Sequence, residues 1–553
     1  MPLKSFLYGV ICPLMVFASQ SVPAASPIDP KRLSDIVRTL ASDEFEGRAP
    51  GTAGEVKTVA YLTESFRALG LVPGGENGRW TQTVPIVRTQ IGKPRALSIS
   101  FAGKARELTQ GRDVYVSTVR KVDRVAIENA LMVFVGYGVT APERQWDDFK
   151  AVDLHGKVAV FLVNDPDFSA AANEPVAGKF GGRRMTYYGR WTYKYEEAAR
   201  RGAIAALIVH DTDGAGYGWE TVIAPGGENY DLVRSNSAGR LALQGWIEGA
   251  VAKELFRSAG LDLAALRTQA RRADFHPTEL KGARFTADLP VTSVAAESRN
   301  VLAKLTGSKH PDETIMFAAH WDAYGVGAPD AQGRTVRAGA NDDALGVAGV
   351  LELARAFAAG PKPQRTLVFA AWTAEERGLL GSQAYAANPL YPLSKTVANL
   401  TLDILQTAGP ARDVLLVGAG QSTLEDDLAK AARAQGRTVT PEALPERGLF
   451  YRADHFPLAR RGVPVLLLMA MSGGADLVDG GREAGNQWLA DYMRCYHQPC
   501  DAWDSQWDLR GAAQDVALFH AIGSELANSR RWPQWRKDSE FNSVRLESAG
   551  ERQ

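Results

Sequence analysis

The stretch TLVFAAWTAEERGLLGS, residues 366–382, decides the fold class of this chain. Its first half is a short apolar run with the length of a buried strand, and its second half opens a glycine-containing turn. Glu375 and Glu376 stand where the two halves meet. The arrangement places two carboxylates at the end of a buried strand, where one can bind a metal while the other moves a proton.

Similar strand-like runs alternate with helical patterns from Asn300 onward. Strands are expected at 314–319, 366–371, 400–404, 414–417 and 465–469, and helices at 344–359, 379–387 and 424–435. Strands and helices at this spacing predict an α/β fold, with a mixed sheet flanked by helices on both faces. Functional side chains in such sheets gather at the carboxyl ends of the strands.

Four further motifs place imidazoles and carboxylates near those ends: HWD (320–322), GANDDALG (339–346), LTLDI (400–404) and YHQPCD (496–501). A hydrolytic divalent metal prefers such ligands. A carboxylate shared by two ions holds them about 3.5–4 Å apart, so that both act on one substrate. The motifs predict a two-metal hydrolytic site, and the lack of HExxH excludes a thermolysin-like one.

The chain has 553 residues, which is too long for one ordinary core and predicts more than one domain. A helical pattern covers 30–71 and short strands cover 80–118, before a β-rich unit that ends near Ala287. The expected organisation is a signal peptide over 1–25, a catalytic domain formed by 26–121 and 288–553, and an insertion over 122–287.

The N-terminus predicts export. Lys4 precedes an apolar stretch over 6–18, and small residues stand at Ala24 and Ala25. This pattern is typical of a secretory signal, since the stretch is short for a membrane span, and a membrane anchor is the alternative. The mature protein is expected to be periplasmic or secreted, without a stable membrane span. Lys plus Arg equals Asp plus Glu at 63 each, so the net charge favours no nucleic-acid partner.

Two cysteines remain after removal of the signal peptide, Cys495 and Cys500, and His497 lies between them. In an oxidising compartment such a pair is typical of a disulfide. The alternative, a thiolate metal site, needs more cysteines than the chain offers.

At these residues the chain resembles the di-zinc exopeptidases of metallopeptidase family 28, which include bacterial leucyl aminopeptidases and the glutamate carboxypeptidases. The resemblance covers GRAPGTAG (47–54), the segment from Asn300 to about Asn528, and an inserted protease-associated domain at 122–287. It implies the zinc-exopeptidase fold and two divalent metal ions, expected to be zinc.

The resemblance also assigns the metal ligands. His320 and Asp403 would hold one ion, Glu376 and His497 the other, and Asp342 would bridge them. Spacing alone does not separate Asp342 from Asp343. In the family, the peptide after the bridging aspartate is often cis.

The remaining roles concern catalysis. The resemblance makes Glu375 the general base and acid, Tyr496 a donor to the developing oxyanion, and Asp322 the carboxylate that orients the imidazole of His320. Glu446, Arg452 and His455 are candidate substrate contacts.

The predicted function is an exported exopeptidase that acts on peptides, with the aminopeptidase mode favoured. An aminopeptidase needs carboxylates for the substrate amine, whereas a carboxypeptidase needs an arginine fork, and Arg447 and Arg452 keep that mode open. The rival functions are a glutaminyl cyclase of the same superfamily and an inactive, receptor-like binding protein.

Overall fold

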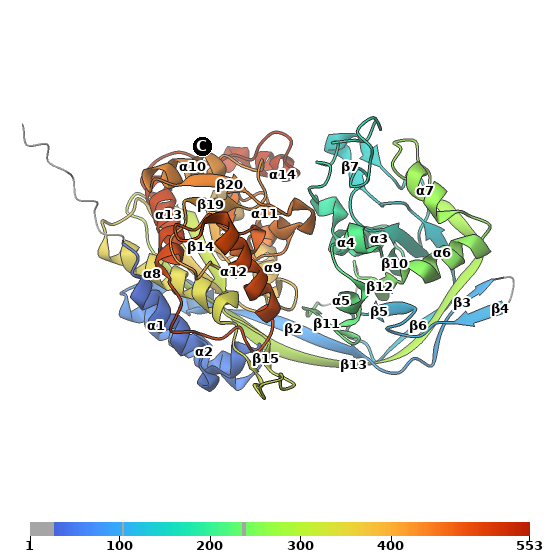
Figure 1. Cartoon of the computed structure of the whole chain (residues 1–553), viewed down its shortest axis with the longest axis horizontal. Coiled ribbons are helices and arrows are strands. Elements are labelled where there is room, and N and C mark those ends of the chain that lie inside the picture. Colours follow the sequence, from blue (N-terminus) through green and yellow to red (C-terminus); the bar gives the residue numbers. More distant parts are fainter. Residues whose placement is uncertain (1–26, 102–103, 235–238, 553) are drawn as a thin grey trace, which may run out of the picture.

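The computed structural model describes residues 27–101, 104–234 and 239–552. The signal peptide expected over 1–25 lies outside the described residues. Two lobes lie side by side, joined along one edge by the long strands β2 (Thr81–Ile91) and β13 (Thr278–Leu305) (Figure 1). No helix in the described part of the chain is both long and apolar enough to cross a membrane.

The larger lobe is built on a mixed sheet whose strands follow the order β21, β18, β14, β17 and β13. These strands span Val465–Leu468, Thr396–Leu402, His310–His320, Arg365–Trp372 and Thr278–Leu305. The first four run parallel, and β13 runs antiparallel to β17. The carboxyl ends of β14, β17 and β18 therefore meet at one edge of the sheet.

Helices cover both faces of this sheet, because alternate strand residues point to opposite sides. Phe317 and Phe369 pack on one side, with α1 (Pro30–Leu40), α2 (Ala53–Ala68), α8 (Leu345–Ala359), α10 (Leu424–Ala434) and α13 (Arg510–Ala527). Met316 and Val368 pack on the other, with α9 (Leu380–Ala387) and α11 (His455–Ala459). The predicted α/β fold is confirmed. The helices α12 (Gly481–Cys495) and α14 (Asn542–Glu547) complete this lobe.

The smaller lobe holds the segment between β2 and β13. Its strands β6 (Arg124–Phe134), β9 (Val158–Leu162), β10 (Ala205–Val209), β12 (Leu243–Ile247) and β5 (Val114–Ser117) lie in that order. Its helices are α3 (Trp191–Arg200), α4 (Thr212–Ala215), α5 (Trp219–Ile223), α6 (Gly249–Ser258) and α7 (Leu263–Gln269). Short strands β3 (Ala96–Phe101), β4 (Lys104–Glu107) and β11 (Glu228–Leu232) extend the sheet system. That this lobe is a protease-associated domain stays a prediction.

Strand β13 belongs to both lobes. It pairs with β6 and β3 up to Pro290, with β2 from Val291 to Val301, and with β17 from Val301 to Leu305. The expected domain boundary between residues 287 and 288 thus falls inside a continuous strand. The burial of β13 alternates over much of its length, because each part covers a different core with the same period of two residues.

One expected strand does not join the main sheet. The run expected at 414–417 forms β19 (Asp413–Leu416), which pairs only with β20 (Thr438–Pro441). The reason is local, since helix α10 returns the chain to the side of β19, where β20 pairs with it.

Candidate metal centre

The side chains predicted for the metal site meet at the carboxyl edge of the main sheet. His320 ends β14, Glu375 and Glu376 follow β17, and Asp403 follows β18. Asp342 comes from the turn Ala340–Ala344 ahead of α8, and its peptide bond to Asp343 is cis. His497 follows α12. Six residues from five segments that lie far apart in the sequence therefore converge on one place.

Two groups of ligand atoms share the carboxylate of Asp342. Nε2 of His320 lies 3.1 Å from Oδ1 of Asp342 and 3.9 Å from Oδ1 of Asp403. Nε2 of His497 lies 3.2 Å from Oδ2 of Asp342 and 3.1 Å from Oε2 of Glu376. One oxygen of Asp342 thus faces each imidazole, which is the geometry that a bridging ligand requires.

The donor set fits divalent zinc. Ligands bound tetrahedrally at about 2.0–2.1 Å lie about 3.3–3.4 Å apart, close to the spacings of the His497 group. Nε2 of His497 is buried near two carboxylates, yet it makes no hydrogen bond of acceptable geometry. Atoms that converge without bonding each other are placed for a shared cation.

The electrostatics of the cluster agree with a bound cation. Burial raises the pKa of Asp403 to about 8, and burial also raises the pKa of Glu376. Burial lowers the pKa of His497, but Glu376 and Asp342 outweigh it and bring the value to about 10. The carboxylates crowd together out of water, so positive charge between them would be stabilising.

Asp342 and Asp343, which the sequence could not separate, have different surroundings. Both oxygens of Asp343 accept backbone amides, Oδ1 from Gly346 at 2.9 Å and Ile404 at 3.3 Å, and Oδ2 from His320 at 3.3 Å. An oxygen of Asp343 also comes within reach of His320 and Asp403. The three amide contacts make Asp343 the less available metal ligand, because they occupy lone pairs that a metal would need.

Asp322 acts on a different partner than expected. Its backbone carbonyl, at 3.0 Å, rather than its carboxylate, at 3.7 Å, is the nearest oxygen to Nδ1 of His320. The carboxylate instead accepts the amides of Glu375 at 3.0 Å and Glu376 at 3.4 Å. Asp322 therefore fixes the turn that carries both glutamates, while its main chain orients the imidazole.

Two residues without an assigned role hold the ligand loops together. Arg48 is fully buried and donates to the carbonyls of Trp321 at 2.8 Å, Leu40 at 2.9 Å, Ala338 at 2.6 Å and Gly339 at 2.9 Å. Asp501 accepts the amides of Asn341 at 2.9 Å and Asp342 at 3.1 Å. The GRAPGTAG and YHQPCD motifs contained both residues, but their partners lie too far away in sequence to be inferred.

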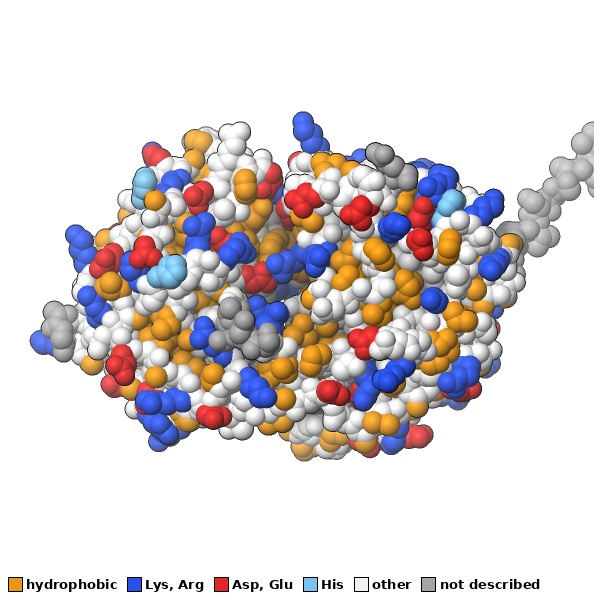
Figure 2. All heavy atoms as spheres, turned by 180° about the vertical axis from the view of Figure 1, so that it is seen from behind, with side chains coloured by type: hydrophobic (Ala, Val, Ile, Leu, Met, Phe, Trp, Pro, Cys, Tyr) orange, Lys and Arg blue, Asp and Glu red, His pale blue; other side chains and the backbone are white. Residues whose placement is uncertain are grey.

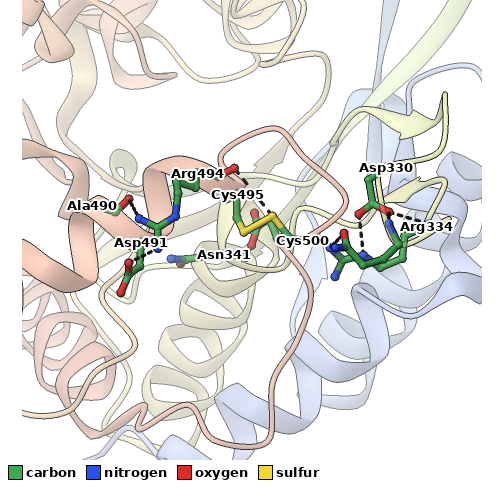
Figure 3. Close-up of a disulfide and its surroundings, with 10 residues drawn as sticks. Asp330, Arg334, Asn341, Ala490, Asp491, Arg494, Cys495 and Cys500 are labelled. Carbon is green, nitrogen blue, oxygen red and sulfur yellow. Dashed lines mark hydrogen bonds and ion pairs between the residues drawn. A yellow bond between two sulfur atoms is a disulfide. The ribbon is translucent and has the colours of Figure 1, made fainter.

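The loop that presents His497 is closed by a disulfide and holds the backbone of His497 in an uncommon conformation. A disulfide joins Cys495 to Cys500 and closes the loop beside Asn341 (Figure 3). His497 has φ 62°, and Ala374 and Ile404 beside the other ligands also have positive φ. Such conformations are uncommon for residues other than glycine and cluster at functional sites.

Glu375 and Tyr496 stand next to the ligand groups without polar partners for their side chains. The carboxylate of Glu375 makes no ion pair or hydrogen bond with a described residue, and burial raises its pKa well above the usual range. The ring of Tyr496 lies 3.6 Å from that of His497. Its hydroxyl donates to no residue in the described part of the chain, so both groups are free to meet a substrate.

The candidate substrate contacts are placed differently from one another. Arg452 is partly buried. Burial lowers its pKa, but Tyr496, Tyr217, Glu375 and Asp403 outweigh burial and raise it, so the side chain lies within electrostatic reach of the cluster. Glu446 lies 4.0 Å from Arg183, at the seam between the lobes. His455 is fully buried behind Phe450, at 4.8 Å between ring centroids, so this placement gives no support to a substrate contact.

Comparisons with known proteins show which proteins the segment that carries this site resembles. The model of Peptidase family M28 matches residues 300–520. A leupeptin-inactivating enzyme from Streptomyces exfoliatus is 31% identical over 41% of this chain and 49% of its own length, so the chain spans about half of that relative. A probable zinc metalloprotease from Pyrenophora teres is 42% identical over 19% of this chain and 22% of its length.

Among solved structures, an aminopeptidase from Aneurinibacillus has a TM-score of 0.48 at 20% identity, covering 91% of this chain and 95% of its own. A zinc aminopeptidase from Bacillus subtilis has a TM-score of 0.42 at 18% identity, covering 93% and 99%. Scores of this size carry no conclusion about activity. The match to Peptidase family M28 covers residues 300–520 and so contains every predicted metal ligand, in agreement with the resemblance of the sequence motifs to that family.

Proposed function

We propose that this chain is an exported, zinc-dependent exopeptidase that removes N-terminal residues from peptides. The observation that carries the proposal is the carboxylate of Asp342, shared by two ligand groups, with the unpartnered Glu375 beside it. Zinc ions in such a site act as Lewis acids and lower the pKa of water.

The protein's own groups complete the reaction. Glu375 takes a proton from the attacking water and returns it to the leaving amine, a role suited to a carboxyl whose pKa is raised by burial. The hydroxyl of Tyr496 donates to the oxygen that becomes negative as the carbonyl is attacked. The carboxylate of Asp322 accepts the backbone amide of Glu375 and so keeps Glu375 in place.

Export is part of the proposal. The signal-like N-terminus and the disulfide between Cys495 and Cys500 both support an oxidising compartment, periplasmic or extracellular. The alternative of an inactive, receptor-like protein is disfavoured by the completeness of the ligand set.

A carboxypeptidase is the second candidate, and one observation favours it: Arg452 lies within electrostatic reach of Glu375 and Asp403 and makes no ion pair with a described residue. Leucine p-nitroanilide and its N-acetylated form separate the modes. We expect zinc-dependent hydrolysis of the free-amine substrate that acetylation abolishes. Hydrolysis of an N-acetylated peptide from its C-terminus would reject the aminopeptidase mode, and no hydrolysis by zinc-loaded protein would reject both.

A further inference from the structure

The imidazoles of the two histidine ligands are held in different ways. Nδ1 of His320 lies 3.0 Å from the carbonyl oxygen of Asp322, so a hydrogen bond fixes the direction of that ring. Nδ1 of His497 makes no hydrogen bond with a described residue. Metal-binding histidines usually donate their second ring nitrogen to a carboxylate, a carbonyl or water, which aims the metal-binding nitrogen. The ring of His497, with 26% of its side chain exposed, lacks that support from the protein.

Two tyrosine rings contact His497 instead. The ring of Tyr324 lies 4.5 Å from the imidazole at an interplanar angle of 43°, and the ring of Tyr496 lies 3.6 Å from it at 31°. Tyr496 directly precedes His497, so its ring belongs to the same loop. Tyr324 comes from the segment that follows β14 and carries the His320 ligand. Tyr324 is therefore the contact that can fix the imidazole of His497 relative to the other ligands.

The guanidinium of Arg377 packs on Tyr324 in turn. Its Cζ lies 4.8 Å from the ring centroid of Tyr324 and 5.0 Å from that of Tyr230. Arg377 follows the ligand Glu376 in the turn after β17, and it makes no ion pair or side-chain hydrogen bond with a described residue. A planar guanidinium stacks well on aromatic faces. With no described acidic partner, stacking on the two tyrosines is the contact that holds this guanidinium.

Tyr230 brings the smaller lobe into this series of contacts. It lies in β11, which pairs with β2, and it packs against an apolar cluster that includes Ala374 and Leu380 of the turn after β17. A hollow lies between the two lobes on the face shown in Figure 2, whereas β11 contacts the ligand turn directly. The segment of the smaller lobe thus reaches a metal ligand through consecutive ring contacts.

We propose that Tyr324 and Arg377 are positioning residues that orient the imidazole of His497 toward its metal ion, and that Tyr230 anchors them to the smaller lobe. A ring that is already held in its binding orientation loses less freedom when the metal binds. The inference rests on the two-metal site of the proposed function and deepens it, because the affinity of one ligand group then depends on the smaller lobe.

Zinc titration of the metal-free protein tests the inference without any substrate. Competition with a chromophoric chelator gives a dissociation constant for each of the two zinc ions. His320→Ala and His497→Ala show which constant belongs to which ligand group, because each variant removes one ligand from one group.

The test variants change one contact at a time. Tyr324→Leu removes the ring beside His497, and Tyr324→Phe keeps it. Arg377→Met and Tyr230→Leu interrupt the contacts further from the metal. Arg67→Met is the matched control, because Arg67 also stacks on an aromatic ring, at 5.9 Å from the centroid of Trp80, but it lies on helix α2, which carries no metal ligand.

We expect Tyr324→Leu to weaken zinc binding by the His497 group about 10- to 100-fold, the range found when the supporting partner of a metal ligand is lost. The constant of the His320 group should change little, and Tyr324→Phe should bind both ions as wild type does. Tyr230→Leu should weaken the same constant as Tyr324→Leu. Arg67→Met should change neither constant.

The sign of the Arg377→Met effect separates positioning from charge. A positive charge near the site opposes cation binding, so its removal would tighten zinc binding if Arg377 acted through charge alone. A positioning role predicts weaker binding, by about two- to fivefold for a partly exposed cation–π contact.

Unchanged zinc binding in Tyr324→Leu, or tighter binding in Arg377→Met, would overturn the inference. Equal weakening of both constants in Tyr324→Leu would also overturn it, because a general loss of structure acts on both groups. An unchanged constant in Tyr230→Leu would overturn the role of the smaller lobe. Failure of the aminopeptidase mode is distinguishable, since it leaves both zinc constants and their dependence on Tyr324 in place. Wild-type protein that binds fewer than two zinc ions would reject the two-metal site and this inference with it.

Discussion

At the scale of single residues, the two adjacent glutamates differ in what their carboxylates meet. Glu376 lies 3.1 Å from His497, whereas Glu375 has no polar side-chain partner among the described residues. We expect Glu375→Gln to bind zinc as wild type does while kcat falls about 10²- to 10⁴-fold, because only the general base is lost. Zinc analysis of the purified variant and steady-state kinetics check this. Glu376→Gln is the comparison, and it should lose zinc first. Retained activity in zinc-loaded Glu375→Gln would contradict the assignment.

The two neighbouring aspartates should also separate by experiment. Asp342→Asn is expected to lower zinc content with little effect on unfolding, because its oxygens face the two imidazoles. Asp343→Asn should instead destabilise the fold by about 1–3 kcal/mol, because its oxygens accept three backbone amides. Metal analysis and thermal unfolding of the metal-free proteins distinguish them. The reverse pattern would show that Asp343 is the bridging ligand.

His455 predicts a pH dependence of stability. Burial lowers the pKa of His455 to about 3, below the value of about 6.5 in an unfolded chain. The unfolded state then binds the proton more readily than the folded state does. The contribution of the neutral His455 to the free energy of unfolding is therefore complete above about pH 6.5 and is lost as pH falls toward 3. We expect His455→Leu to reduce the slope of the free energy of unfolding against pH, on the acid side, by up to about 1.4 kcal/mol per pH unit. Denaturant unfolding at pH 4.5 and 7 measures this, and identical slopes would contradict it.

At the scale of elements, Arg48 connects the turn Asp43–Arg48 to two loops of the metal centre. Its guanidinium donates to four carbonyls, two of them at Trp321 and Gly339. Arg48→Met should cost about 3–5 kcal/mol of stability, because the carbonyls lose their donors inside the protein. Chemical unfolding measures the loss. Arg79→Met, at an exposed position, should change stability by less than about 0.5 kcal/mol. Equal effects would mean that Arg48 does not anchor these loops.

At the scale of the whole molecule, the docking of the two lobes depends on Tyr187. Its ring packs on Tyr451 and Phe456 of the larger lobe. We expect Tyr187→Ala to cost about 3 kcal/mol or more and to separate calorimetric unfolding into two transitions, because it empties this contact. Tyr187→Phe keeps the ring and loses only the hydrogen bond of the hydroxyl to Glu196, so it should keep a single transition and lose about 1 kcal/mol. A single unshifted transition in Tyr187→Ala would show that the contacts of Tyr187 are not needed to hold the lobes together.

Local sequence patterns predicted most elements of the larger lobe closely. The helix expected at 344–359 is α8 (Leu345–Ala359), and the strand expected at 366–371 is β17 (Arg365–Trp372). Such elements bury a face whose period is readable in a short window. The strand expected at 414–417 is β19 (Asp413–Leu416), but the sequence did not show that it pairs with β20 outside the main sheet, since pairing depends on where α10 returns the chain.

The sequence by itself determined the α/β class, the family M28 segment and the residue types of the metal centre. Ligands at the carboxyl ends of parallel strands meet wherever such a sheet forms. Only the tertiary structure decided that Asp342 faces both imidazoles while Asp343 takes backbone amides, and that β13 serves both lobes. It also decided the partners of Arg48. These contacts join residues that lie far apart along the chain, and no local pattern encodes the distance between them.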